Sequence, residues 1–196
     1  MDKKVRCWST DNPLHIRYHD EEWGVPLHDD QRFFEFLVLG GFQAGLTWWL
    51  ILQRRDAFRQ AFDNFNPEVI AIYTAVDIER LMKAPQIIHN KMKIRAAINN
   101  AKCFVEIQME FGSFDAFIWS FFNGTIHNSF SKLEDLPAET EMSTQISKAL
   151  RQRGFQFVGP TICYAFMQAT GLVNDHLATC FRHKQLKEHD MSPKQV

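Results

Sequence analysis

Apolar residues recur at intervals of three and four along most of the chain, and this helical period restricts the possible folds more than any other feature of the sequence. The period is clearest between residues 87 and 111, where it predicts one long amphipathic helix. Shorter periodic stretches begin at cap residues or prolines, such as Asp29 and Pro67. Because no segment alternates polar and apolar residues in the manner of a strand, the sequence predicts a compact all-α fold.

The composition supports a folded core. The 196 residues are 45% hydrophobic and 13% aromatic, which excludes intrinsic disorder. At this length we expect one domain over residues 1–183, formed by two helical lobes, and a polar, flexible tail over residues 184–196. Four scattered cysteines are too few for a disulfide scaffold, and the first residues lead directly into polar sequence. We therefore expect a cytoplasmic protein with reduced thiols.

One uncharged stretch, from Phe36 to Leu52, reaches the lower length limit of a membrane-spanning helix. Gly40, Gly41 and Gly45 interrupt it, and a glycine pair favours a division into two shorter helices. We therefore interpret the stretch as part of the core and expect no membrane association.

The charged residues are unevenly distributed, although the net charge is only -1. Residues 80–105 contain basic side chains and no acidic one, and the same is true of residues 143–174. The small net charge excludes a uniformly basic nucleic-acid protein. The two basic segments are consistent either with solvated helix faces or with contacts to a local anionic partner.

Two cysteines and two histidines have the chemistry of a metal site. His176 and Cys180 are four residues apart, which on a helix places both side chains on one face, and Cys7 and His19 lie near the other end of the chain. If the two ends of the chain meet, these residues form a tetrahedral Cys2His2 zinc site. Buried thiols and unrelated histidines are the alternative interpretation.

Aromatic residues are concentrated in the first fifty positions, close to His15 and His19. They are Trp8, Tyr18, Trp23, Trp48 and Trp49. Several have polar neighbours, which favours the wall of a pocket that stacks on a flat ligand. Aromatic residues at helical spacing are also typical of a core, and both interpretations remain open at this point.

Five motifs in collinear order closely resemble the bacterial 3-methyladenine DNA glycosylase I family. They cover residues 7–8, 18–26, 43–48, 148–161 and 171–176, and the similarity extends from about residue 6 to residue 180. The resemblance implies a helix-hairpin-helix DNA glycosylase fold with a structural zinc ion that joins the N- and C-terminal segments. It also implies hydrolysis of the N-glycosidic bond of alkylated purines, 3-methyladenine foremost, after the base is flipped into an aromatic pocket.

The family's functional positions carry over to three groups of residues. The implied zinc ligands are Cys7, His19, His176 and Cys180. The implied base pocket contains Trp8, Tyr18, Trp23, Gly40, Gln43 and Trp48. The implied DNA contacts are Leu46, His89, Asn90, Lys91 and Lys93. In this group Leu46 is either a wedge that enters the gap left by the flipped nucleotide or simply the first core residue of its helix.

The chain departs from the family pattern at positions that bear on specificity. Where the family has Leu-Glu-Gly, with a carboxylate that reads the damaged base, this chain has Leu39-Gly40-Gly41. His15 replaces a tyrosine of the pocket region, and His89 stands where an arginine is usual in a hairpin turn that here lacks glycine. The alternatives are therefore a glycosylase with altered lesion specificity or a non-catalytic protein that binds damaged DNA.

The expected enzyme is monofunctional, because the sequence contains no motif for a lysine nucleophile that would cleave the DNA strand. No catalytic residue is assigned; Glu22 and Asp175 are candidates, and each could instead orient a zinc-binding histidine. Gln43, Glu35 or Glu22 could replace the missing carboxylate of the pocket. The expected partner is double-stranded DNA with alkylated bases, bound by a monomer.

Overall fold

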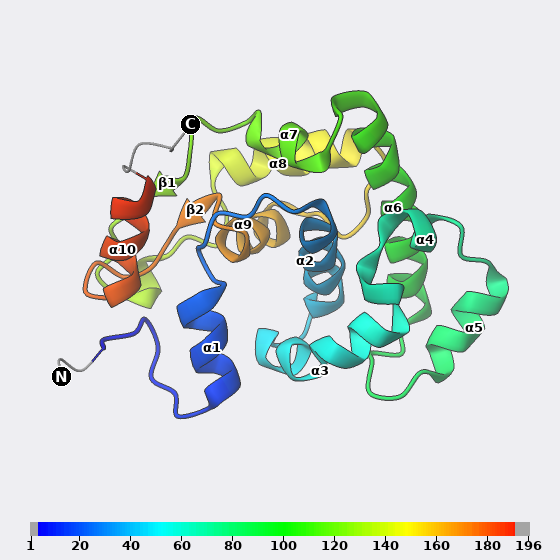
Figure 1. Cartoon of the computed structure of the whole chain (residues 1–196), viewed down its shortest axis with the longest axis horizontal. Helices are drawn as coiled ribbons and strands as arrows, with labels where there is room; N and C mark the ends of the chain where they lie inside the picture. Colours follow the sequence, from blue (N-terminus) through cyan, green and yellow to red (C-terminus); the bar gives the residue numbers. More distant parts are fainter. Residues whose placement is uncertain (1–3, 191–196) are drawn as a thin grey trace.

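The computed structural model describes residues 4–190, and helices dominate it (Figure 1). The helices are α1 (Pro13–Glu21), α2 (Asp30–Gln43), α3 (Trp48–Ala61), α4 (Pro67–Ala71), α5 (Ala75–Lys83), α6 (Lys91–Phe111), α7 (Phe114–Trp119), α8 (Glu141–Gln152), α9 (Pro160–Ala169) and α10 (Phe181–Asp190). Two single turns of 3-10 helix are also present: η1 (Asp63–Phe65) lies between α3 and α4, and η2 (Leu133–Asp135) precedes α8. Two two-residue strands, β1 (Ile126–His127) and β2 (Val173–Asn174), pair in parallel. The predicted helical architecture is confirmed, apart from this short strand pair.

Side-chain caps fix where the main helices begin. Asp29 accepts a hydrogen bond from the backbone of Arg32 at the start of α2, as its position in the sequence predicts. The long helix α6 begins at Lys91 rather than at residue 87, because the side chain of Asn90 caps its first turn. The residues before Asn90 form the turn that connects α5 to α6.

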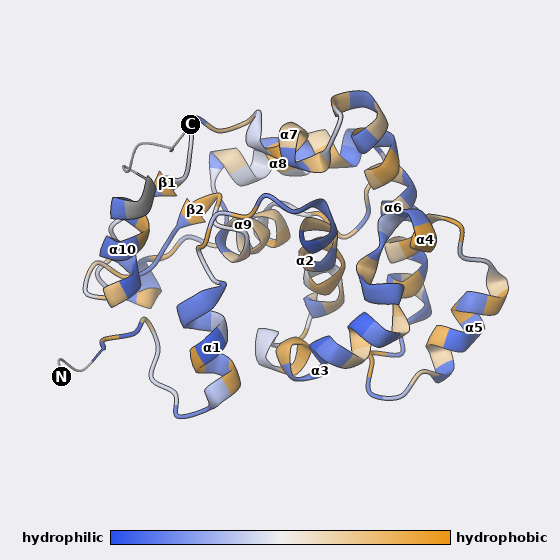
Figure 2. Ribbon diagram, in the orientation of Figure 1, coloured by the Kyte–Doolittle hydropathy of each residue, from blue (hydrophilic) through white to orange (hydrophobic). Residues whose placement is uncertain are grey.

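Helix α2 is the central element of the core. It packs against α3, α6, α7 and α9, and its phenylalanines are fully buried among aromatic residues of these neighbours, such as Phe104 and Phe114. Figure 2 shows hydrophilic residues at the start of α2 and hydrophobic ones along most of its length. The uncharged stretch of the sequence therefore belongs to the core, as expected. Within residues 4–190, no helix has the length and apolar character needed to cross a membrane.

The N-terminal segment lies beside α10, although the two are far apart in the sequence (Figure 1). The backbone of Phe181 donates to the carbonyl of Val5 at 3.0 Å. Helix α10 continues through residues 184–190, which the sequence analysis assigns to a flexible tail, because Leu186 on this helix is buried. The remainder of the predicted tail, residues 191–196, lies outside the described residues. The meeting of the two chain segments creates the first candidate site.

Candidate functional site

Four buried side chains, Cys7, His19, His176 and Cys180, converge where the N- and C-terminal segments meet. Their ligand-type atoms all lie within 4.8 Å of one another. Cys7 precedes α1 and His19 lies on it. His176 and Cys180 lie in the turn between β2 and α10, and not on a helix as the four-residue spacing suggested. The structure thus brings together all four residues of the predicted metal site.

The distances within this cluster match a tetrahedral centre. Cys7 Sγ lies 3.3 Å from His176 Nδ1, and Cys180 Sγ lies 3.5 Å from both His176 Nδ1 and His19 Nε2. Zinc binds sulfur at about 2.3 Å and imidazole nitrogen at about 2.0–2.1 Å, so neighbouring ligands of a tetrahedral ion are about 3.5 Å apart. The four residues could therefore hold one metal ion.

Each histidine of the cluster is also held in place through the ring nitrogen that does not face the cluster. His19 Nδ1 lies 2.8 Å from the carboxylate of Asp20, which also accepts two hydrogen bonds from Arg6. His176 Nε2 lies 2.9 Å from the carbonyl of Trp23. These acceptors favour the tautomers that direct the free lone pairs of His19 Nε2 and His176 Nδ1 into the cluster.

The two cysteines of the cluster differ in the pKa of their thiols. A hydrogen bond between the thiol of Cys7 and the sulfur of Cys180, strengthened by burial, raises the pKa of Cys7. The same hydrogen bond lowers the pKa of Cys180, which the two histidines lower further. The pair therefore favours a Cys180 thiolate beside a protonated Cys7, and a bound cation would favour loss of the second proton.

A cavity of about 500 Å³ adjoins the cluster and is the second candidate site. All six predicted pocket residues line it: Trp8, Tyr18, Trp23, Gly40, Gln43 and Trp48. The N-terminal part of its wall also contains Ser9, Thr10, His15, Phe36 and Trp49. Helix α9 contributes Phe166 and Gln168. The sequence analysis missed these α9 residues, because nothing in their local pattern distinguishes a cavity wall from the core.

The aromatic rings of the cavity form two connected groups. The ring centroids of Tyr18 and Trp48 are 5.4 Å apart and the planes are tilted by 45°, which makes a corner against which a flat molecule can stack. Trp8 and Trp23 meet edge to face at 5.1 Å. Trp8 also packs edge-on against His19 of the cluster at 4.7 Å. The metal-type cluster therefore supports one wall of the cavity directly.

The described residues that line the cavity include no Asp, Glu, Lys or Arg. Burial lowers the pKa of His15, which keeps this imidazole neutral at pH 7, and burial raises the pKa of Tyr18, which keeps the phenol protonated. Polar groups are nevertheless present. The indole N–H of Trp48 is buried without a partner among the described residues, and the amide of Gln168 donates to Asp175 at 2.8 Å.

Gly40 lies in the cavity wall on α2. A Cβ atom added there would meet only Ile162 Cγ2, at an ordinary contact distance of 3.6 Å. The position can therefore accept a side chain, and glycine leaves open space in its place.

Neither candidate catalytic residue lines this cavity. Asp175 is buried and accepts hydrogen bonds from Asn128 and Tyr164 as well as Gln168. Glu22 accepts a hydrogen bond from Arg55 at 2.6 Å. Neither one orients a cluster histidine either, because Asp20 and the carbonyl of Trp23 hold those rings.

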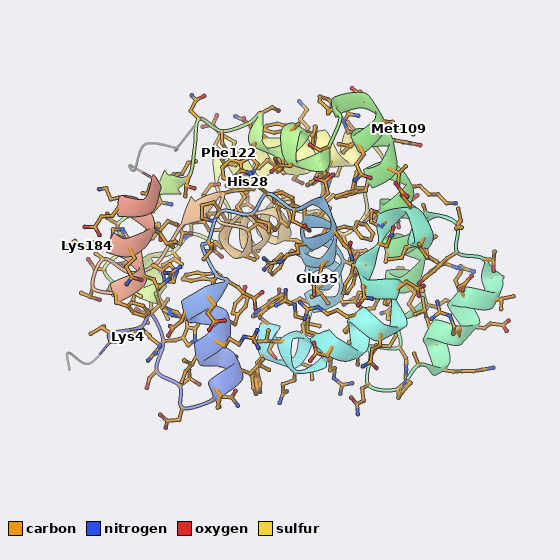
Figure 3. The ribbon with its side chains drawn as sticks, in the orientation of Figure 1. Lys4, His28, Glu35, Met109, Phe122 and Lys184 are labelled. Atoms are coloured by element: carbon orange, nitrogen blue, oxygen red, sulfur yellow. The ribbon has the colours of Figure 1, made fainter. Side chains whose placement is uncertain are left out.

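Glu35 also lies outside the cavity, in a buried ion-pair network. Glu35 lies on α2, where Figure 3 labels it. Its carboxylate pairs with Arg55 and Arg59 of α3 at 2.8 Å each. Burial alone would raise the pKa of Glu35, but these two guanidinium groups outweigh it and lower the pKa. Because Arg55 also pairs with Glu22, the network ties together α2, α3 and the end of α1, which carry Trp48 and Tyr18.

The predicted DNA contacts fall into two groups. Leu46 is 38% exposed in the turn between α2 and α3, and Lys91 is exposed at the start of α6. His89 is exposed and contacts the carbonyl of Ala84 at 2.6 Å, while Asn90 caps α6. Lys93 is different, because it is only 9% exposed. Its ammonium group is directed to the carbonyls of Phe42 and Ala44 rather than to solvent.

Comparisons with known proteins agree with this geometry. Residues 8–183 match the methyladenine glycosylase family. The DNA-3-methyladenine glycosylase of Haemophilus influenzae is 45% identical over 178 residues, which cover 90% of this chain and 96% of that protein. DNA-3-methyladenine glycosylase 1 of Escherichia coli K12 is 44% identical over 177 residues, or 89% and 95% of the two chains.

Solved structures show the same likeness. A crystal structure of 3-methyladenine DNA glycosylase I superposes with a TM-score of 0.86 at 45% identity and covers 90% of this chain and 98% of its own. A variant of 3-methyladenine DNA glycosylase I in complex with 3-methyladenine superposes with a TM-score of 0.85 at 38% identity, over 88% and 93% of the chains. The fold and site therefore define a DNA glycosylase of the helical type. The chain belongs to the methyladenine glycosylase family.

The ion-pair network generates a first prediction. Replacement of Arg55 by Met should lower the free energy of unfolding by about 3 kcal/mol or more, because it removes a partner of the buried carboxylate of Glu35 and of the partly buried carboxylate of Glu22. Urea unfolding followed by circular dichroism measures this change. The matched control is Arg17→Met, in an exposed pair with Glu21, which should change stability by less than about 1 kcal/mol.

The same network sets a pH dependence. The pKa of Glu35 in the folded protein lies below its ordinary value of 4.5. Its contribution to the free energy of unfolding is therefore fully present above pH 4.5. This contribution is lost as the pH falls through the pKa of Glu35 in the folded protein. Equal destabilisation by Arg55→Met and Arg17→Met would contradict a stabilising role for Arg55. An Arg55→Met variant as stable as the parent at pH 7 would also contradict it.

Proposed function

We propose that this protein is a DNA repair glycosylase that hydrolyses the N-glycosidic bond of alkylated purines, 3-methyladenine foremost. The observation that carries the proposal is the uncharged, aromatic cavity of about 500 Å³, lined by all six residues expected for a base pocket. Its size and flat rings suit a purine, and the relatives that share its fold are named for this reaction on 3-methyladenine.

The proposed reaction uses the charge of the damaged base. A purine alkylated at N3 is cationic in DNA, so it leaves as a neutral molecule when the bond from its ring nitrogen to the sugar breaks and the electron pair stays on the base. Water adds to the sugar carbon and loses a proton. The protein flips the nucleotide at a cost of a few kcal/mol and recovers about 1–3 kcal/mol from stacking the base on aromatic rings.

The corner formed by Tyr18 and Trp48 is our candidate for the stacking surface. A cationic base gains an additional cation–π attraction there, which a neutral, undamaged adenine lacks. Since no lysine lines the cavity in the described part of the chain, no amine is available to form a Schiff base with the sugar. This supports a monofunctional enzyme that leaves the DNA strand uncut.

A second candidate function is action on a different lesion, or binding of damaged DNA without catalysis. The supporting observation is Gly40, which leaves open space and no carboxylate in the cavity wall. A base with a larger substituent would fit such a wall, whereas the hydrogen bonds of a carboxylate would be missing. The first candidate is favoured because the aromatic surfaces that stack on a flipped base are complete.

Base release tests the first candidate. The purified protein, incubated with methylated duplex DNA, should release free 3-methyladenine, detected by chromatography, and should leave the strands intact. Trp48→Ala should slow single-turnover release by about tenfold or more, because a stacking surface worth about 1–3 kcal/mol is lost. Phe111→Ala, an aromatic residue outside the cavity, is the control and should release base at the parent rate. Complete absence of released base from the parent protein would contradict this function.

The profile of released bases separates the candidates. If Gly40 widens the lesion range, the parent protein should release 3-methylguanine or bulkier adducts alongside 3-methyladenine, and Gly40→Glu should narrow the profile toward 3-methyladenine. Gly40→Ala adds only a methyl group within an ordinary contact distance and is the control for folding. Tight binding of alkylated DNA with no release, even in Gly40→Glu, would instead favour the non-catalytic candidate.

We further propose that the four-residue cluster holds a structural zinc ion. Two sulfur and two imidazole ligands, near-tetrahedral spacing and complete burial are the features of a closed zinc site. Protein side chains would fill all four coordination positions of the ion. No position would remain open for substrate. Its contribution would be to fix the N-terminal segment against the turn before α10.

Metal analysis tests this proposal. The purified protein should contain one zinc ion per chain, and Cys180→Ser should lose it because serine is a poor zinc ligand. Cys103→Ser is the matched control, since Cys103 is also buried but lies on α6 outside the cluster. A parent protein without bound metal, or a Cys180→Ser variant with full zinc content, would contradict the assignment.

The remaining aspects of the function follow from these proposals. We propose that residues 1–183 act as one domain, with two helical lobes on either side of the cavity. The proposed partner is double-stranded DNA, contacted by Leu46, His89, Asn90 and Lys91 and bound by a monomer. The proposed location is the bacterial cytoplasm.

A further inference from the structure

Lys93 is a buried lysine whose ammonium group donates to two backbone carbonyls inside the protein. It lies in the first turn of α6, and its Nζ donates to the carbonyl of Phe42 at 2.8 Å and to that of Ala44 at 2.6 Å. Burial lowers the pKa of Lys93, because removal from water disfavours the charged ammonium group. Lys91, two residues earlier, is exposed. The ammonium group of Lys93 therefore binds backbone carbonyls inside the protein, whereas Lys91 is exposed on its surface.

The carbonyls bound by Lys93 lie at the C-terminal end of α2. The last carbonyls of a helix lack partners within the helix and carry the negative end of its dipole, so a cation there is stabilising. Helix α2 has no basic residue in its own last turn. Lys93 supplies a basic group from α6. It therefore connects the first turn of α6 to the C-terminal end of α2.

The segment held in this way leads directly to the cavity and to its rim. Gln43, between the two bound carbonyls, lines the cavity, and Trp48 lines it from the first position of α3. The turn between them passes through Gly45, whose φ of +78° favours glycine, and exposes the side chain of Leu46. An exposed leucine beside the cavity is suited to fill the gap that a flipped nucleotide leaves in the base stack.

We propose that Lys93 is a positioning residue for base extrusion and not a phosphate ligand. By holding the carbonyls of Phe42 and Ala44, it fixes the turn that presents Leu46 to the DNA and places Gln43 and Trp48 in the cavity wall. This inference rests on the proposed function in that it assigns a step of the same reaction.

Salt dependence and base flipping, measured on the same variants, test the inference. The probe is duplex DNA with 2-aminopurine next to a stable abasic-site analogue, whose fluorescence rises when the neighbouring stack opens. Lys93→Met should leave the slope of binding affinity against salt unchanged, because no phosphate contact is lost. It should reduce the fluorescence change at saturating protein and slow single-turnover base release by about tenfold or more, because the turn is misplaced.

The control is Lys91→Met, which should reduce the salt slope by about one unit and leave the fluorescence change at saturation intact. Leu46→Gly should reproduce the Lys93→Met phenotype, and the double variant should show little further loss, because both substitutions disable the same step. Lys93→Arg keeps the charge but not the fit between the two carbonyls. It should show the unchanged slope and a smaller loss of flipping, and it replaces Lys93→Met in the comparison if the latter does not fold.

The outcomes are distinguishable from a failure of the proposed function. A salt slope reduced by about one unit in Lys93→Met would identify Lys93 as a phosphate ligand and overturn the inference, whether or not any base is released. Unchanged flipping in Lys93→Met would also overturn it. A parent protein that opens the stack but releases no base would contradict the proposed reaction and leave the positioning role supported by the fluorescence data.

Discussion

The convergence of Cys7, His19, His176 and Cys180 is the contact on which the rest of the site depends. It joins two segments that are separated by more than 150 residues. Trp8 packs on His19, and Trp23 packs on His176 with ring centroids 4.6 Å apart. The position of one cavity wall is therefore determined by the cluster, so that a metal ion bound there would act on base recognition without touching the base.

Among the residues that the structure describes, no Asp, Glu, Lys or Arg side chain lines the cavity. Outside the cavity, Arg55 and Arg59 pair with the buried carboxylate of Glu35, and Arg55 also pairs with Glu22. The ammonium group of Lys93 donates to the carbonyls of Phe42 and Ala44. A base entering this space meets aromatic faces and a few neutral dipoles. In such surroundings a positive charge on the base gains cation–π attraction, whereas burial of an uncompensated protein charge would be costly.

Local features of the fold could be predicted from the sequence, and features that depend on distant contacts could not. Asp29 and the periodicity of α6 predict helices because caps and amphipathic faces act locally. The spacing of His176 and Cys180 suits a helix or a turn equally well, and the turn seen here depends on contacts with distant residues such as Cys7 and Trp23. Lys93 has the sequence context of a phosphate ligand. A signal was nevertheless present, since Lys93 precedes Ala96 and Ala97 on the buried face of α6.

If the cluster of Cys7, His19, His176 and Cys180 holds a metal ion, that ion should support the aromatic wall of the proposed base cavity. The most direct measurement is binding of free 3-methyladenine, followed by tryptophan fluorescence, before and after removal of metal with a chelator. We expect the affinity for 3-methyladenine to fall in step with metal content and to be restored by added zinc. Far-ultraviolet circular dichroism should show the helices retained throughout. Undiminished binding of 3-methyladenine by the metal-free protein would contradict it.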